Sequence, residues 1–123
     1  MNVSVKAYGS FSKVGSPTRT HRDIEYEALV QITRRVRSAA DQSKLGFGKL
    51  AEALHQNQSL WDTFAIDVSD RSNPLPRELK AQIIYLAEFT RHQTKEILTR
   101  NASIDPLIEV NTAIMRGLKG RAD

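Results

Sequence analysis

The chain has 123 residues, of which 40% are hydrophobic and 26% are charged, and it contains no cysteine, which excludes disulfides, thiolate metal sites and cysteine nucleophiles. The net charge is +4, and all of it is supplied within residues 1–22 by Lys6, Lys13, Arg19 and Arg22. The rest of the chain is neutral, which disfavours a basic stripe for nucleic acid on a folded surface.

Residues 1–16 are small, polar and aperiodic, and we expect a flexible basic arm there, followed by a single helical-bundle domain over residues 17–123. No apolar run approaches the roughly 20 residues that span a bilayer. The N-terminus also has no continuous apolar segment of the kind found in secretory signals. We therefore expect a cytoplasmic protein that does not insert into a membrane.

Apolar residues recur at three- and four-residue steps from Ile24 to Ala40, which predicts an amphipathic helix over about Thr20–Asp41. Pro17, preceded by Ser16, offers an alternative start for this helix. Gly46 and Gly48 then indicate a turn.

A second stripe keeps one phase from Phe47 to Val68, and its one polar member is Asn57. It predicts either one long helix or two helices broken near residues 56–59. One helix, with or without a kink, is favoured.

After a loop at residues 70–76, a third stripe predicts a helix from about Leu79 to Asn101. Asp105 and Pro106 then indicate the start of a fourth helix, with Asp105 as the N-cap, that ends at Gly117 or Gly120. Four helices with short connections predict an all-α fold, a small bundle.

Glu88, His92 and Glu96 lie at four-residue steps, so they share one helix face and form a candidate metal site. The same pattern is more typical of a solvated face with ion pairs between residues four apart. No ligand from a second element is evident, so we expect no metal.

His55 lies near Glu52 and Asp62 on the second predicted helix, and a histidine paired with a carboxylate is a candidate general base. The chain has no nucleophile elbow, no phosphate-binding loop and no HExxH motif. We therefore predict no catalytic residues, no cofactor and no enzymatic activity.

Arg34, Arg35 and Arg37 form the densest basic cluster outside the arm. It suits contact with phosphate or with an acidic partner, but the outer face of an amphipathic helix is the favoured interpretation.

Asn57 and Asn111 each interrupt an apolar stripe, where an unpaired amide costs about 1–3 kcal/mol. They pair between helices of the bundle or set the register of a partner helix in a groove, and the sequence leaves both open. Trp61 suits either the core or a partner pocket.

Three stretches, in order and at matching spacing, resemble the family of flagellar biosynthesis regulators called FlaF. They are residues 52–61 (EALHQNQSLW), 75–84 (LPRELKAQII) and 107–118 (LIEVNTAIMRGL), and the resemblance extends from Ala7 to Leu118. It implies a small helical cytoplasmic factor needed for flagellin production and export. The family is understood to associate with flagellin and to work opposite a partner, FlbT, that acts on flagellin messenger RNA. The resemblance implies no catalytic residue and no cofactor.

We therefore expect a flagellin-binding chaperone and regulator that holds an amphipathic helix of unassembled flagellin in an apolar groove. The residues expected to contact this partner combine apolar positions with out-of-place amides: Asn57, Leu60, Trp61, Asn111, Ile114, Met115 and Leu118. The alternative is a post-transcriptional regulator that contacts flagellin mRNA or an FlbT-type partner through the basic arm and residues 34–37. We do not expect direct binding of nucleic acid, because the body of the chain has no net charge.

Overall fold

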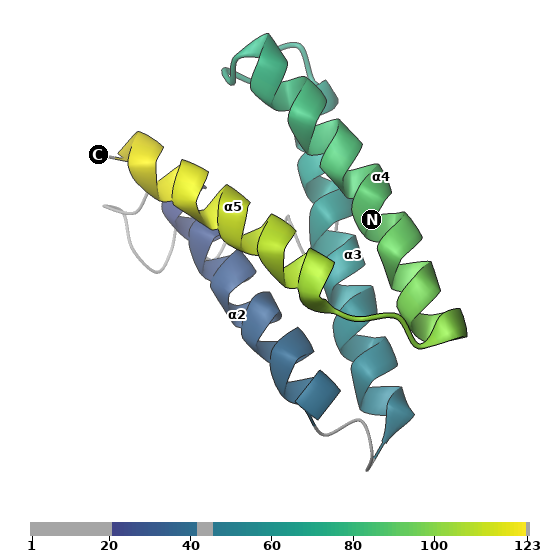
Figure 1. Cartoon of the computed structure of the whole chain (residues 1–123). Helices are drawn as coiled ribbons and strands as arrows, with labels where there is room; N and C mark the ends of the chain where they lie inside the picture. Colours follow the sequence, from purple (N-terminus) through teal and green to yellow (C-terminus); the bar gives the residue numbers. More distant parts are fainter. Residues whose placement is uncertain (1–20, 42–45, 123) are drawn as a thin grey trace.

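The computed structural model describes residues 21–41 and 46–122, and these residues form four α-helices (Figure 1). The helices are α2 (His21–Asp41), α3 (Phe47–Ser69), α4 (Arg77–Arg100) and α5 (Asp105–Ala122). Each runs antiparallel to the one before it, and the described residues contain no strand. The predicted all-α bundle of four helices is confirmed. The predicted arm at residues 1–16 and the predicted start of the first helix lie outside the described residues.

The long central stripe folds as one helix. α3 runs without a break from Phe47 to Ser69, so the favoured one-helix prediction is confirmed. Because α3 packs against both α2 and α4, it buries a wider arc than a single apolar stripe provides. Two polar residues within that arc, Gln58 and Thr63, are buried together with Asn57.

The apolar core has two parts at opposite ends of the bundle. The lower cluster lies near the α2–α3 and α4–α5 connections and consists of Val36, Ala39, Leu50, Ala53, Leu54, Ile97 and Leu107. The upper cluster lies toward the α3–α4 connection and consists of Leu29, Trp61, Phe64, Val68, Ile83 and Ala87. On each helix a polar residue separates the two clusters: Thr33, Asn57, Thr90 and Asn111, all of them buried.

The connection between α4 and α5 begins with a left-handed residue. Asn101 has φ 56° and ψ 36°, and its backbone N–H donates to the carbonyl of Ile97 (3.2 Å). Asparagine tolerates this conformation better than most residues, which ends α4 cleanly.

The start of α5 differs from the prediction by one residue. The carbonyl of Ile104, not that of Asp105, accepts the first helical bond, from the N–H of Ile108 (3.2 Å). The hydroxyl of Ser103 accepts a bond from the N–H of Asp105 (3.0 Å), which begins the turn one residue earlier. Asp105 therefore lies in the first turn of α5, where its carboxylate faces the positive end of the helix dipole.

α4 and α5 make few contacts with each other. Figure 1 shows them running apart from their connection toward the top of the view. α5 packs chiefly against α2 and much less against α4. Among the described helices, none is both long enough and apolar enough to pass through a lipid bilayer.

Candidate functional site

A buried hydrogen-bond network joins three helices around the side chain of Asn111 in α5. Its Nδ2 donates to Thr33 Oγ1 of α2 (3.0 Å) and to Asn57 Oδ1 of α3 (2.8 Å). Its Oδ1 accepts a bond from the indole Nε1–H of Trp61 (2.8 Å). The amide of Asn111 thus uses both of its donor hydrogens and one lone pair of its oxygen.

The network answers one question that the sequence left open. Asn57 and Asn111 pair with each other inside the bundle, and they are 0% and 1% exposed. Trp61 is also 0% exposed, and its ring packs edge-on against Phe64 with centroids 5.6 Å apart. In this arrangement the three side chains offer no surface to a partner. Direct partner contact stays a prediction for them, and it requires the bundle to open.

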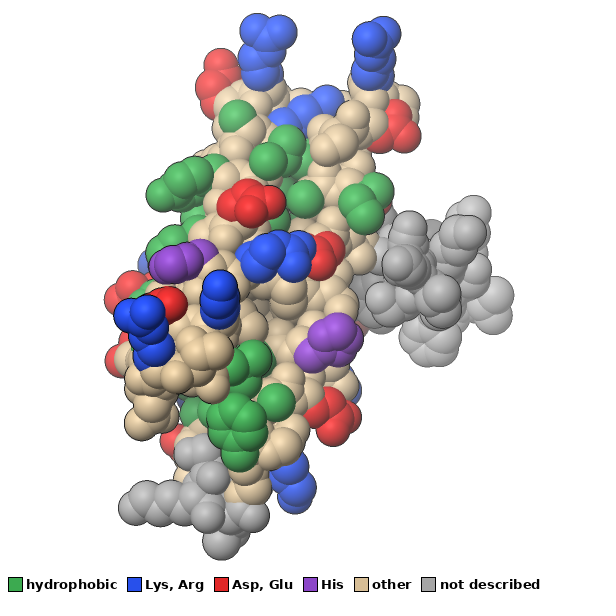
Figure 2. All heavy atoms as spheres, turned by 90° about the vertical axis from the view of Figure 1, so that its right-hand side faces the viewer, with side chains coloured by type: hydrophobic (Ala, Val, Ile, Leu, Met, Phe, Trp, Pro, Cys, Tyr) green, Lys and Arg blue, Asp and Glu red, His purple; other side chains and the backbone are tan. Residues whose placement is uncertain are grey.

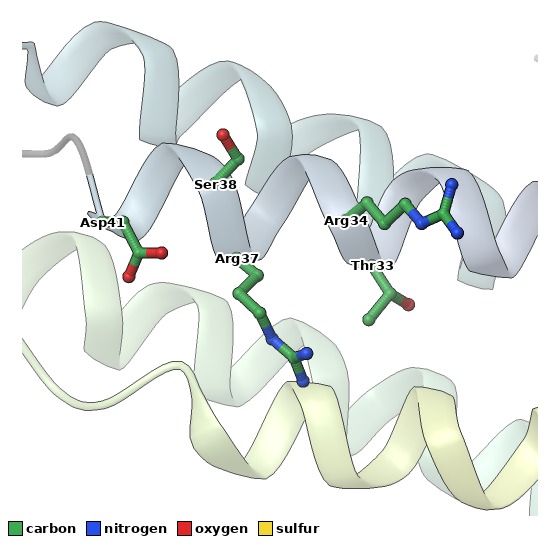
Figure 3. A pocket seen from close by; sticks show the side chains of 5 residues that line it. All are labelled: Thr33, Arg34, Arg37, Ser38 and Asp41. Carbon is green, nitrogen blue, oxygen red and sulfur yellow. The ribbon is translucent and has the colours of Figure 1, made fainter.

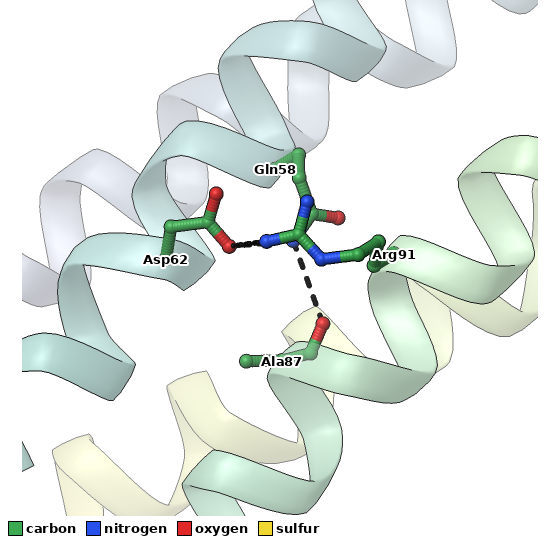
Figure 4. A network of polar contacts seen from close by, with 4 residues as sticks. All are labelled: Gln58, Asp62, Ala87 and Arg91. Carbon is green, nitrogen blue, oxygen red and sulfur yellow. Dashed lines mark hydrogen bonds and ion pairs between the residues drawn. The ribbon is translucent and has the colours of Figure 1, made fainter. Parts of the chain in front are cut away.

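The seam between α3 and α4 carries a second polar group (Figure 4). Gln58 Nε2 donates to Asp62 Oδ1 (2.9 Å) and to the carbonyl of Ala87 across the seam (3.4 Å). Arg91 of α4 forms an ion pair with the same oxygen of Asp62 (2.5 Å). The buried bond of Gln58 and the exposed ion pair of Arg91 together position α4 against α3.

Four buried side-chain atoms of these helices have no hydrogen-bond partner: Asn57 Nδ2, Gln58 Oε1, Thr90 Oγ1 and Thr94 Oγ1. An unpaired buried polar atom costs free energy, so the buried polar side chains of α3 and α4 are less well satisfied than that of Asn111 in α5.

The predicted apolar contact residues occupy the edge of the upper cluster. Leu60, Ile114 and Met115 are half-buried and pack against that cluster. Leu118 belongs to α5, but its side chain lies outside the described residues. Five more half-buried apolar residues pack against the same cluster, and three of them lie on α4 and α5: Leu79 and Leu86 of α4 and Val110 of α5. We call Leu79, Leu86, Val110, Ile114 and Met115 the α4–α5 edge.

The candidate metal residues are not brought together with further ligands. Glu88 and His92 are exposed, while Glu96 lies 3.9 Å from Arg100 in an ion pair one turn along α4. Among the described residues, no group of three or more potential ligands is placed to hold a metal ion. Figure 2 shows the face on which α3 and α4 lie, with acidic, basic, histidine and apolar side chains intermixed over it.

The candidate general base is likewise not assembled. His55 is exposed on α3. Asp62 bonds to Gln58 and Arg91 instead of His55.

Arg34, Arg35 and Arg37 are exposed on α2, as expected for the outer face of an amphipathic helix. Two depressions adjoin them. One is lined entirely by α2, and Figure 3 shows Arg34 and Arg37 extending from that helix, with Arg37 directed toward α5. The other lies between α2 and α3 and is also lined by Arg34, together with Arg35 and Lys49.

Sequence reasoning did not single out Thr33 and Gln58 as members of the polar groups. Thr33 follows the buried Leu29 by one helical turn, and that spacing is the signal that could have placed it inside. Gln58 gave no such signal, because it adjoins the apolar stripe of α3 and is buried only through its contact with α4.

A model of a known family matches almost the whole chain. The family is described as flagellar protein FlaF, and the match extends over residues 6–118, which include all three stretches noted in the sequence. The chain belongs to the FlaF family. The network around Asn111 and the α4–α5 edge are therefore features of a FlaF-family protein. No curated protein and no solved structure gives a significant match.

Proposed function

We propose that this FlaF-family protein is a flagellin-binding chaperone and regulator, which acts in the cytoplasm and promotes the synthesis and export of flagellin. It acts by binding a partner helix and not by catalysis, and it requires no cofactor. Membership of a family of flagellar proteins supports a role in the flagellum. The observation that carries the binding mode is the α4–α5 edge.

The α4–α5 edge has the chemistry of a helix-binding surface. Its five side chains are half-buried and apolar, and they flank the upper cluster on two helices that run apart. Leu79 and Leu86 are seven residues apart, and Val110 and Ile114 are four apart, so each pair lies along one helix face. An amphipathic helix laid between α4 and α5 would contact both rows.

Covering this edge supplies a favourable free energy. Completing the burial of one half-buried Leu, Ile or Met contributes about 1 kcal/mol, roughly half the value for full burial. Met115 also adapts to differently shaped partners, because its side chain is unbranched and polarizable. Unassembled flagellin would present such a helix, and covering it would delay aggregation or early polymerisation.

Within this proposal, Asn57, Trp61 and Asn111 position the edge while the bundle is closed, and they contact the partner only if the bundle opens. Trp61 belongs to the upper cluster against which Ile114 and Met115 pack. The hydrogen bond from Trp61 to Asn111 fixes α5, and with it the two edge residues, relative to α3.

Calorimetric titration of the chain with its own monomeric flagellin, at low and high salt, tests the proposal. We expect micromolar or tighter binding that survives high salt, because burial of apolar surface is far less screened than charge pairing. Met115→Ser should weaken binding about tenfold, equal to roughly 1.4 kcal/mol. Ile84→Ser is the matched control, because Ile84 is an exposed apolar residue of α4 outside the edge. Absence of binding at both salt concentrations, or equal losses in the two variants, would contradict the proposal.

A second candidate function rests on a different surface, formed by Arg34, Arg35 and Arg37 of α2. The exposed cations of α2 could serve a regulator that contacts flagellin mRNA or an FlbT-type partner. Affinity for RNA should fall steeply between low and physiological salt. Steep salt dependence without flagellin binding would move the assignment to this second function.

A further inference from the structure

The depression between α2 and α3 is a basic groove. It has a volume of about 660 Å³ and is lined by three cations, Arg34, Arg35 and Lys49, against a single acidic residue, Glu52. Its lining includes the small side chains of Ala39 and Ala53, which are buried and belong to the lower cluster. The groove therefore joins an apolar floor to a positively charged rim.

Among the residues that the structure describes, none neutralises the cations of this groove. Arg35 donates to the neutral amide oxygen of Gln56 on α3 (3.3 Å). Within the residues that the structure describes, no carboxylate forms an ion pair with Arg34, Arg35 or Lys49. The three positive charges are therefore free to pair with groups from outside.

Arg35 is also held in place across the groove. Its bond to Gln56 ties the guanidinium of α2 to α3, 21 residues away along the chain. An ordered guanidinium gives up less conformational entropy when it pairs with a partner, and its fork of donors matches a carboxylate.

We propose that the groove between α2 and α3 docks an acidic helical segment of a partner protein, through Arg34, Arg35 and Lys49. Two observations favour an acidic protein segment over RNA. The basic patch is short and belongs to a body of zero net charge, whereas RNA binding relies on a field that extends over many phosphates. The groove lining also contains no aromatic side chain on which a base could stack.

This surface is separate from the α4–α5 edge. It lies between α2 and α3, and no residue of α4 or α5 lines it. An acidic partner could therefore bind while a flagellin helix occupies the edge, and the inference stands whether or not flagellin binding is found.

The test uses fluorescence anisotropy with a labelled helical peptide that carries glutamates at four-residue spacing. The matched peptide has glutamine at the same positions. The groove variant is R34Q/R35Q/K49Q, and the control variant R71Q/R77Q/K95Q removes the same charge from exposed positions elsewhere. Circular dichroism should show equal thermal midpoints for both variants and the unaltered chain.

We expect the glutamate peptide to bind the unaltered chain and the glutamine peptide not to bind. The groove variant should bind the glutamate peptide about tenfold more weakly, because each exposed ion pair contributes roughly two- to threefold. The control variant should bind this peptide as tightly as the unaltered chain. Three results would overturn the proposal: no peptide binding, equal loss in both triple variants, or displacement of the peptide by oligouridine RNA that itself depends on the groove cations.

Discussion

Asn111 shows how one buried amide can fix the relation between three helices. Its three bonds reach Thr33, Asn57 and Trp61 on two other helices, in a position that is 1% exposed. Hydrogen bonds of this kind contribute about 1 kcal/mol each when made. Left unmade they cost more, so the network enforces one register of α5 against α2 and α3.

The two asparagines should therefore differ in their effect on stability. Asn111→Ala removes three bonds and leaves Trp61 Nε1, Asn57 Oδ1 and Thr33 Oγ1 unpaired, so we expect a loss of about 3 kcal/mol or more. Asn57→Ala deletes the same volume but breaks one bond and also removes an unpaired donor, so a loss of about 1–2 kcal/mol is expected. Urea unfolding of both variants gives the comparison. Equal losses would show that the network adds nothing beyond packing.

Sequence reasoning reached these residues but not their partners. Asn57 and Asn111 were identifiable because each interrupts an apolar stripe. The bond between them joins positions 54 residues apart, and the bond to Trp61 joins positions 50 apart. Helical periodicity has a range of a few turns, so it cannot choose between a partner within the bundle and one outside it.

At the scale of elements, the connection between α3 and α4 is fixed by side chains that bond to nearby backbone. Asp70 Oδ1 accepts bonds from both the backbone N–H and the hydroxyl of Ser72 (2.8 Å each). Asn73 Oδ1 accepts a bond from the N–H of Leu75 (3.0 Å). Such bonds end a helix and redirect the chain, which explains why the loop was predictable from its Asp, Asn, Ser and Pro residues.

The Asp70 turn should make stability depend on pH in the acid range. The backbone N–H and then the hydroxyl of Ser72 bond to the charged carboxylate, and so hold the pKa of Asp70 below its ordinary value of 3.8. The stabilisation is therefore present above pH 3.8 and is lost as the pH falls through the lower pKa of the folded chain.

Carbon-detected NMR titration should give an Asp70 midpoint below 3.8. Ser72→Ala should raise that midpoint only in part, because the backbone bond remains. Asp70→Asn keeps an acceptor in the turn and should remove this part of the pH dependence. A midpoint at or above the ordinary value would show that the turn does not favour the charged form.

The positions of the helices along the chain were largely predictable, but the extent of the buried face of each helix was not. The phase of the α3 stripe correctly gave one helix from Phe47, because an unbroken alternation of three- and four-residue steps fits a single helix axis. The burial of Gln58 was not apparent, since its side chain contacts a neighbouring helix, α4. Likewise, the hydroxyl of Ser103 moved the start of α5 by one residue from the predicted cap.

At the scale of the whole molecule, the four helices do not pack evenly against one another. α3 packs against both of its sequence neighbours, while α4 and α5 part from their shared connection. That divergence leaves the α4–α5 edge half-buried. Sequence reasoning named Ile114 and Met115 on this edge but not Leu79 and Leu86, because the angle between two helices is set by tertiary packing and leaves no periodic signal.

The central claim is that the α4–α5 edge receives a helix of unassembled flagellin. Methyl NMR of the chain tests it most directly, because leucine, isoleucine, valine and methionine methyls report each edge residue separately. On addition of monomeric flagellin, we predict shifts at Leu79, Leu86, Val110, Ile114 and Met115, with Ile66 and Ile84 on the exposed outer surface unchanged. Shifts confined to the outer surface, or no shifts at flagellin concentrations well above micromolar, would contradict the claim.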